Sequence, residues 1–178
     1  MKAFSSVKES LAEIKKGEFV ILVDEPEREN EGDFFIPAEF VTSEKVNFMI
    51  TEGKGLLCVA MDSASASRLA IPLMVSSYEN TESTKVNFGI SVNASRGITS
   101  GISAYDRART IQVLANPRSK SADITKPGHI FPLVANEGGL KARQGHTEAA
   151  VALAQLAGLN PMGVLCEILK ENGRMARV

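Results

Sequence analysis

The sequence is poor in the residues from which redox and zinc sites are built. Its 178 residues include two cysteines, Cys58 and Cys166, and two histidines, His129 and His146. No CxxC pair occurs, and this supply of thiols and imidazoles excludes a thiolate or three-histidine zinc site. Each cysteine lies in an apolar run, where a reduced thiol fills core space, so no disulfide is implied. Any bound metal is therefore expected to be a hard cation on oxygen ligands.

Long apolar runs and an excess of charge of one sign are also lacking. No run approaches the roughly 20 apolar residues needed to cross a bilayer, and residues 1–9 show no apolar segment behind a basic stretch. Lys and Arg number 20 against 21 Asp and Glu, and they form no basic stripe. These absences predict a cytoplasmic protein that binds neither a membrane nor nucleic acid.

The composition that remains is typical of a globular protein. Hydrophobic residues make up 44% of the chain and charged residues 23%. A chain of this length buries roughly 70% of the surface that it exposes when unfolded, which is enough for one sizeable core. No internal repeat or linker is visible, so residues 1–178 are expected to form a single domain.

Hydrophobic periodicity predicts an alternation of helices and strands. Ser6 and Glu9 form a capping box before an amphipathic helix that Gly17 ends. Further helices are expected at 43–52, from Ser103 to Pro117, and from a Thr147 cap to Gly158. Strands are expected at 19–23, 34–36, 55–61, 86–92, 128–134 and 162–169, with a hairpin turn at 172–173. The mixture of hairpin and crossover connections indicates an α+β fold with a mixed sheet and helices.

The predicted strand at 86–92 has a regular alternation of apolar and polar residues. Val86, Phe88, Ile90 and Val92 would face the core. The polar residues between them would then form the opposite face, which is expected to line a cavity.

A cluster of acidic residues follows the first predicted strand. The segment from Asp24 to Asp33 contains six carboxylates around a single Arg28. Composition alone is equally compatible with a solvated acidic loop. Ligands tend to bind at strand ends, magnesium uses one or two carboxylates plus substrate oxygens, and an arginine offers a fork for phosphate. The arrangement therefore makes the segment a candidate binding site.

A second candidate is a polar loop that runs into a helix N-terminus, from Arg143 through His146 to Thr147. The free N–H groups and positive dipole of such an end suit a phosphate. The alternative is a structural helix cap, and a partner carboxylate would be needed to make His146 a metal ligand.

Two isolated residues complete the candidates. Glu167 is the single charged residue of the apolar run 164–169. It either points outward from an edge strand or faces a cavity. In a cavity, desolvation would raise its pKa and suit it to proton transfer. His129 lies beside an apolar strand, where a lone histidine is more often structural.

Five segments, in order, closely resemble the 3,4-dihydroxy-2-butanone 4-phosphate synthase family: Asp24–Asp33, Gly97–Arg107, Pro127–Leu133, Gly145–Glu148 and Gly163–Glu167. The resemblance runs from the first helix to Val178. It implies that family's α+β fold and a homodimer with active sites at the subunit interface. It also implies the magnesium- or manganese-dependent conversion of ribulose 5-phosphate to 3,4-dihydroxy-2-butanone 4-phosphate and formate, in riboflavin biosynthesis.

The resemblance also implies roles for individual residues. Glu29 and His146 would ligate the metal ion, and His129 and Glu167 would be catalytic. The substrate would be held by Arg28, Glu29, Asp33, Arg143, Gln144, Gly145, His146, Thr147 and Glu167. The reaction needs such groups, because an enediolate develops charge on adjacent oxygens and protons must move at several carbons.

The resemblance departs at the end of the chain. Family members usually continue past the segment matching Met175–Val178 by another strand and helix, so the chain is expected to be short there. The short end would leave an apolar edge or patch at 162–169, which a homodimer is expected either to bury or to tolerate as exposed. Two alternatives remain open. A sugar-phosphate isomerase or aldolase would use the same chemistry without releasing formate. An inactive regulatory paralogue would not need the intact catalytic and metal-binding residues.

Overall fold

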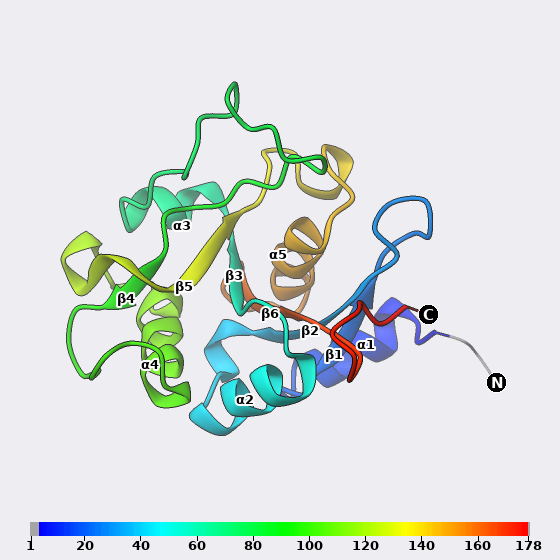
Figure 1. Ribbon diagram of the computed structural model, residues 1–178, viewed down its shortest axis with the longest axis horizontal. Helices are drawn as coiled ribbons and strands as arrows, with labels where there is room; N and C mark the ends of the chain where they lie inside the picture. Colours follow the sequence, from blue (N-terminus) through cyan, green and yellow to red (C-terminus); the bar gives the residue numbers. More distant parts are fainter. Residues whose placement is uncertain (1–3, 178) are drawn as a thin grey trace.

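A computed structural model describes residues 4–177 and contains one six-stranded sheet in the order β1-β2-β6-β3-β5-β4 (Figure 1). Neighbouring strands are antiparallel, except that β3 and β5 run parallel. The sheet is therefore mixed and the fold is α+β, as the sequence predicts. The strands are β1 (Val20–Val23), β2 (Gly32–Pro37), β3 (Cys58–Met61), β4 (Val92–Ala94), β5 (Ile124–Val134) and β6 (Met162–Glu167).

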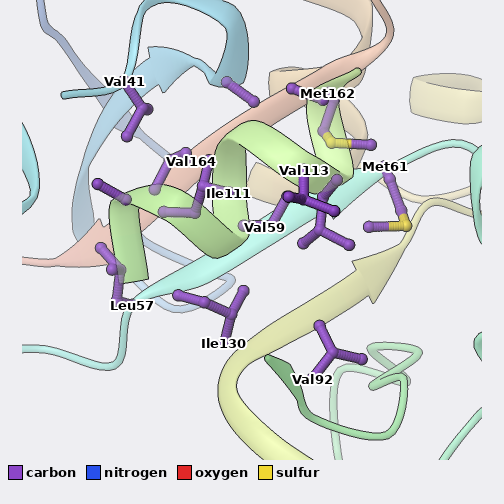
Figure 2. Packing of buried hydrophobic residues seen from close by; sticks show 14 of the residues in the cluster. Val41, Leu57, Val59, Met61, Val92, Ile111, Val113, Ile130, Met162 and Val164 are labelled. Atoms are coloured by element: carbon purple, nitrogen blue, oxygen red, sulfur yellow. The ribbon is translucent and has the colours of Figure 1, made fainter. Parts of the chain in front are cut away.

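Helices cover both faces of the sheet. On one face lie α2 (Ser43–Phe48) and α4 (Ala104–Ala115), and on the other lie α1 (Val7–Ile14) and α5 (His146–Leu156). Side chains alternate accordingly: Val59 and Val164 pack with Ile111 of α4 (Figure 2), whereas Cys58 and Leu165 face α5. The central strands are buried on both sides, which explains their uninterrupted apolar runs. A further small helix, α3 (Ser63–Arg68), and helical turns at 38–40, 49–53, 121–123 and 139–141 complete the structure.

Several elements form where local signals predict them. The capping box of Ser6 and Glu9 begins α1, and the Ser103 hydroxyl accepts the N–H of Asp106 at the start of α4. The helix expected at 43–52 is α2 followed by a π-helical turn over Met49–Gly53. Within residues 4–177, every helix is too short or too polar to span a bilayer.

The segment 86–92 is not the regular strand that its alternation predicts. Phe88 and Gly89 form isolated bridges only, to Leu133 and Leu73, and β4 begins at Val92. The neighbouring segments contain Pro72, whose carbonyl accepts the N–H of Ile90, and Pro132, whose carbonyl accepts the N–H of Gly89. Proline has no N–H group, so neither residue can donate a hydrogen bond in return. The ladder therefore breaks. The segment 86–92 reaches the cavity described below through apolar side chains, those of Val86 and Phe88, rather than through its polar ones.

Helix α5 begins two residues earlier than expected. Gly145 is its N-cap, with extended φ of -111° and ψ of 163°, and no side chain caps the helix. Thr147 lies inside the first turn and is 3% exposed, so its predicted capping role is wrong. A Cβ at Gly145 would lie 2.1 Å from Arg143 Nη1, so a larger residue there would displace the Arg143 side chain.

Strand β6 is central rather than an edge strand. It pairs with β2 on one side and with β3 on the other. The expected apolar edge at 162–169 is therefore absent, because strands remote in sequence cover it. The exposed apolar edge is β1 instead, where Ile21 is 54% exposed and Val23 is 36% exposed.

The turn at 172–173 does form, but the segment after it barely pairs. Gly173 N–H donates to the carbonyl of Lys170 at 2.9 Å. The return segment makes one isolated bridge, between Leu169 and Met175. The hairpin is thus a turn with a short arm rather than a pair of strands.

Candidate active site

Strands β2 and β6 place two carboxylates side by side. Their antiparallel register pairs Asp33 with Glu167. Both side chains belong to the face covered by α5, because Phe35 and Leu165, the next residues on that face, pack there. Asp33 is 6% exposed and Glu167 is partly buried. Like charges directly opposite one another are destabilising, so the pair is more typical of a functional site than of a structural one.

The backbone before β3 orients Glu167. Its Oε2 accepts a hydrogen bond from Leu56 N–H at 2.7 Å. Gly55 allows this approach, since a Cβ there would lie 2.5 Å from the same oxygen. Burial, together with the charges of Asp33 and Glu31, raises the pKa of Glu167. A carboxyl group of raised pKa exchanges protons closer to neutral pH. Glu167 lines a cavity and lies on a central strand, so the alternative in which it points outward from an edge strand is wrong.

His146, the first residue of α5, is joined to Asp33. Its Nδ1 lies 3.0 Å from Asp33 Oδ2, and the two side chains are 12% and 8% exposed. Within residues 4–177, His146 Nε2 and Asp33 Oδ1 are buried without a hydrogen-bond partner. A histidine whose Nδ1–H binds a carboxylate presents its Nε2 lone pair as metal-ligating histidines do. Asp33 is thus the partner carboxylate that a metal role for His146 requires.

The charge around His146 is strongly negative. Burial opposes protonation of the ring, but the hydrogen bond to Asp33 and the charges of Asp33 and Asp24 outweigh it and raise the pKa of His146. A negative field of this kind favours any cation at the ring, whether a proton or a metal ion.

Asp24 organises the acidic loop between β1 and β2. Its carboxylate accepts the N–H groups of Glu29 and Glu31, at 3.1 and 2.8 Å, and Arg28 Nη1 at 2.6 Å. Burial opposes ionisation of Asp24, but these hydrogen bonds outweigh it and lower the pKa. Arg28 Nη1 also lies 2.7 Å from Glu29 Oε2. The segment is therefore a structured loop rather than a freely solvated one.

His146 and the carboxylates of Glu29, Glu31, Asp33 and Glu167 border one cavity of about 220 Å³. Gln144 and Gly145 line an adjoining cavity of about 770 Å³, which Arg28 and His146 also border. The structure thus brings most of the predicted site residues together. Those that line the smaller cavity are Arg28, Glu29, Asp33, Arg143, His146, Thr147 and Glu167.

Arg143 is held by a network that sequence reasoning missed. Its Nη1 pairs at 2.7 Å with Glu148, which is 1% exposed. Its Nε and Nη2 donate to the carbonyl and hydroxyl of Thr84, at 2.8 and 3.1 Å. The remaining N–H donors of the guanidinium stay available for an anion. The sequence contains one sign of this network, because Glu148 is an acidic residue within an apolar, alanine-rich helix and such a residue needs a partner when buried.

A third segment reaches the cavity through Glu82 and Thr84. The Glu82 carboxylate accepts hydrogen bonds from Thr84 N–H, Thr84 Oγ1–H and Val86 N–H. Although burial acts in the opposite direction, these bonds lower the pKa of Glu82 to about 2. Nothing in the polar run 80–85 distinguishes it from an ordinary surface loop, so the sequence carried no usable signal here.

His129 lies outside both cavities, on β5 beside β4. Its Nδ1 is 3.2 Å from Asn93 Nδ2, and Gly101 packs against both groups. Among the described residues, His129 is thus the predicted site residue that the structure separates from the rest.

The cysteines fill the core, as predicted. Cys58 is 2% exposed and Cys166 is 0% exposed. Burial raises the pKa of both thiols, to about 12 for Cys166. Cys58 borders the cavity, but a thiol of raised pKa stays protonated near neutral pH and is a poor nucleophile.

Comparison with known proteins identifies the family. The family model for 3,4-dihydroxy-2-butanone 4-phosphate synthase matches residues 8–178. The chain belongs to this family. Curated relatives include the riboflavin biosynthesis protein RibBA of Bacillus cereus strain B4264, 53% identical, and that of Bacillus cytotoxicus, 50% identical, each over 98% of this chain. The chain spans 43% of the length of these relatives.

Solved synthases share the fold. RibBX, a two-domain 3,4-dihydroxy-2-butanone 4-phosphate synthase from A. baumannii, has a TM-score of 0.92 at 48% identity, covering 97% of this chain and 50% of that one. A 3,4-dihydroxy-2-butanone 4-phosphate synthase in complex with two magnesium ions has a TM-score of 0.90 at 39% identity, covering 98% of this chain and 82% of that one. The α+β fold implied by the sequence resemblance is therefore confirmed.

Proposed function

We propose that the chain converts ribulose 5-phosphate to 3,4-dihydroxy-2-butanone 4-phosphate and formate in riboflavin biosynthesis. Membership of the synthase family and the naming of its Bacillus relatives support this reaction. The observation that carries the proposal is the cavity itself. It combines Glu167, whose pKa is raised, with the buried pair of Asp33 and His146 and with Arg143 beside an uncapped helix.

The phosphate of the substrate binds at the start of α5. Because no side chain caps this helix, the N–H groups of its first turn are open to an anion. Arg143 adds its unused N–H donors from the smaller cavity, and Gln144 and Gly145 border the adjoining larger one. Fixing the phosphate there holds the sugar chain in one register along the cavity, where Arg28 and Asp33 contact its hydroxyl groups.

Proton transfer falls to Glu167. Its Oε2 is oriented by Leu56 N–H, and its raised pKa lets it take up and return a proton near neutral pH. The neighbouring charge of Asp33 helps to set that pKa, since two carboxylates in one pair resist ionising together.

The donor set fits Mg²⁺ or Mn²⁺. Glu29 and the free Nε2 of His146 border the same cavity. Among the described residues, no group of three or more His, Cys, Asp and Glu side chains completes a metal site. Water and substrate oxygens would supply the remaining ligands, as magnesium prefers. When bound, the cation would supply positive charge that stabilises negative charge developing on the substrate oxygens.

A homodimer would complete the site. Glu167 lies in the cavity and His129 lies outside it, although the reaction is proposed to use both. Each is bordered by an exposed apolar side chain: Leu56 next to Glu167 is 42% exposed, and Ile102 next to Gly101 is 53% exposed. We infer that these two surfaces meet across a twofold axis, so that His129 of the partner subunit reaches the cavity.

An assay of formate tests the proposed function. With ribulose 5-phosphate and magnesium, formate should appear in step with loss of substrate, and a chelator should stop it. A sugar-phosphate isomerase or aldolase would consume the substrate without formate. Formate release that a chelator leaves undiminished would refute the metal role.

A further inference from the structure

The register between β4 and β5 jumps beside His129. Val92 pairs with Ile130, but the next residue, Asn93, pairs with Thr125. Residues 126–129 are therefore an insert in β5 without ladder partners on β4. Irregularities of this kind re-aim side chains and are common next to active sites.

The side chains of Asn93 in β4 and of Ser91 just before it replace the missing ladder. Ser91 Oγ accepts the N–H of Gly128 at 3.2 Å, and Asn93 Oδ1 accepts the N–H of His129 at 2.9 Å. Gly128 makes this close approach possible, because a Cβ there would lie 2.2 Å from Asn93 N. Asn93 is 8% exposed, so its amide is enclosed rather than solvated.

The loop before α4 closes the other side of the amide. A Cβ at Gly101 would lie 2.3 Å from Asn93 Nδ2 and 2.6 Å from His129 Nδ1, so only glycine fits. Asp106, 5% exposed, holds this loop through the N–H groups of Thr99 and Gly101 and the Thr99 hydroxyl. The carboxylate of Asp106 is thereby committed to the loop, and the group presented to the imidazole is the amide of Asn93.

The contacts decide which atom of Asn93 meets the ring. Oδ1 is bound to the His129 N–H at 2.9 Å, and this bond sets the orientation of the amide. Nδ2 and Oδ1 then lie at nearly equal distances from His129 Nδ1, 3.2 and 3.3 Å, so distance does not choose between them. Oδ1 already has a donor in the His129 N–H, whereas the enclosed Nδ2 has Nδ1 as its acceptor. An amide nitrogen donates only, so satisfying Nδ2 requires Nδ1 to accept, and a neutral imidazole that accepts at Nδ1 carries its proton on Nε2.

We propose that Asn93 is a positioning residue that holds His129 as its Nε2–H tautomer and so offers Nε2 to the substrate. This inference rests on the proposed function, in which His129 is catalytic. Asn93 acts through the imidazole and need not touch the substrate. The register jump, the two close-fitting glycines and the enclosed amide then share one role, which is to fix the orientation and tautomer of one ring.

Nitrogen-15 NMR of the ring nitrogens tests the tautomer directly in the wild-type protein. The chain has two histidines, so a His146→Gln variant assigns the signals. The neutral His129 ring should carry its proton on Nε2. Asn93→Asp keeps the shape but replaces the donor with an acceptor, so the proton should move to Nδ1. In that variant kcat should fall by about 10²-fold or more with KM unchanged.

Asn160→Asp is the matched control. Asn160 Nδ2 donates to the carbonyl of Ala115 at 3.1 Å, so the same chemical change occurs away from His129 and should leave both tautomer and kcat as in wild type. A wild-type ring protonated on Nδ1 overturns the proposal, and the result does not depend on any Asn93 variant folding. An Asn93→Asp protein with unchanged tautomer and kcat also overturns it. An Nε2–H ring in a protein that releases no formate supports the positioning and refutes the proposed function.

Discussion

Glu167 carries a pH signature that can be measured without substrate. Its pKa in the folded protein lies above the ordinary value of 4.5, chiefly because burial disfavours the charged form. The native state therefore binds more protons than the unfolded chain between those two pKa values, and the free energy of unfolding falls as pH rises through that window.

The prediction concerns Glu167→Gln, which cannot ionise. Its free energy of unfolding should exceed that of wild type at neutral pH, and the difference should vanish below about pH 4.5. Urea unfolding at a series of pH values measures this. Parallel profiles for the two proteins would show that Glu167 is not desolvated in solution.

The two metal-ligand candidates come from distant segments yet should share one ion. Glu29→Gln and His146→Ala should each nearly abolish turnover and weaken magnesium binding, because Glu29 and the free His146 Nε2 border the same cavity. Asp33→Asn should lower metal affinity less, by about 10- to 100-fold, since Asp33 orients the ring from behind. Titration calorimetry measures all three. Wild-type affinity in either ligand variant would remove that residue from the metal site.

At the scale of elements, the approach of β3 to β6 positions the catalytic carboxylate. A methyl group at Gly55 would lie 2.5 Å from both Oε2 and the backbone carbonyl oxygen of Glu167, so Gly55→Ala should displace this residue and lower kcat by about 10²-fold. Gly32→Ala is the control, because its Cβ would meet Ile21 at an ordinary 3.5 Å. Thermal melts of both variants separate lost activity from lost folding. Equal kcat in the two variants would contradict the role assigned to Gly55.

The elements that were predictable from the sequence are those whose signals are local. The Ser6 and Ser103 caps lie within four residues of the groups they bind, so α1 and α4 could be predicted. The central place of β6 could not, because it depends on pairing with strands remote in sequence. The failure at 86–92 has the same origin, since Pro72 and Pro132 interrupt the ladder from other segments.

The candidate site also has features that the sequence could predict and features that it could not. The resemblance named residues of the right chemistry, and the structure brings Glu29, Asp33, His146 and Glu167 to one cavity. The contact of Arg143 with Thr84 joins segments 59 residues apart, and no pattern in either segment announces it. Periodicity also could not show that His129 faces a different surface from Glu167.

At the scale of the whole molecule, the separation of His129 from Glu167 makes dimerisation testable through activity. His129→Ala and Glu167→Gln should each be inactive alone. Coexpression should restore about a quarter of wild-type activity, because half of the dimers would be mixed and each would contain one intact site. Sedimentation velocity at micromolar concentration should show a dimer. A fully active monomer, or coexpression without recovery, would place both residues in one subunit and contradict the shared site.

The most direct test of the account follows one carbon atom. The reaction implied by the resemblance to the synthase family removes C4 of the sugar phosphate as formate. Ribulose 5-phosphate labelled with carbon-13 at C4 should therefore pass its label into formate, observed by NMR, when wild-type protein and magnesium are present. Glu167→Gln should bind the substrate and release no labelled formate, because a glutamine keeps the shape of the side chain but cannot exchange the proton. Label that stays in a sugar phosphate while the substrate is consumed would contradict the proposed reaction.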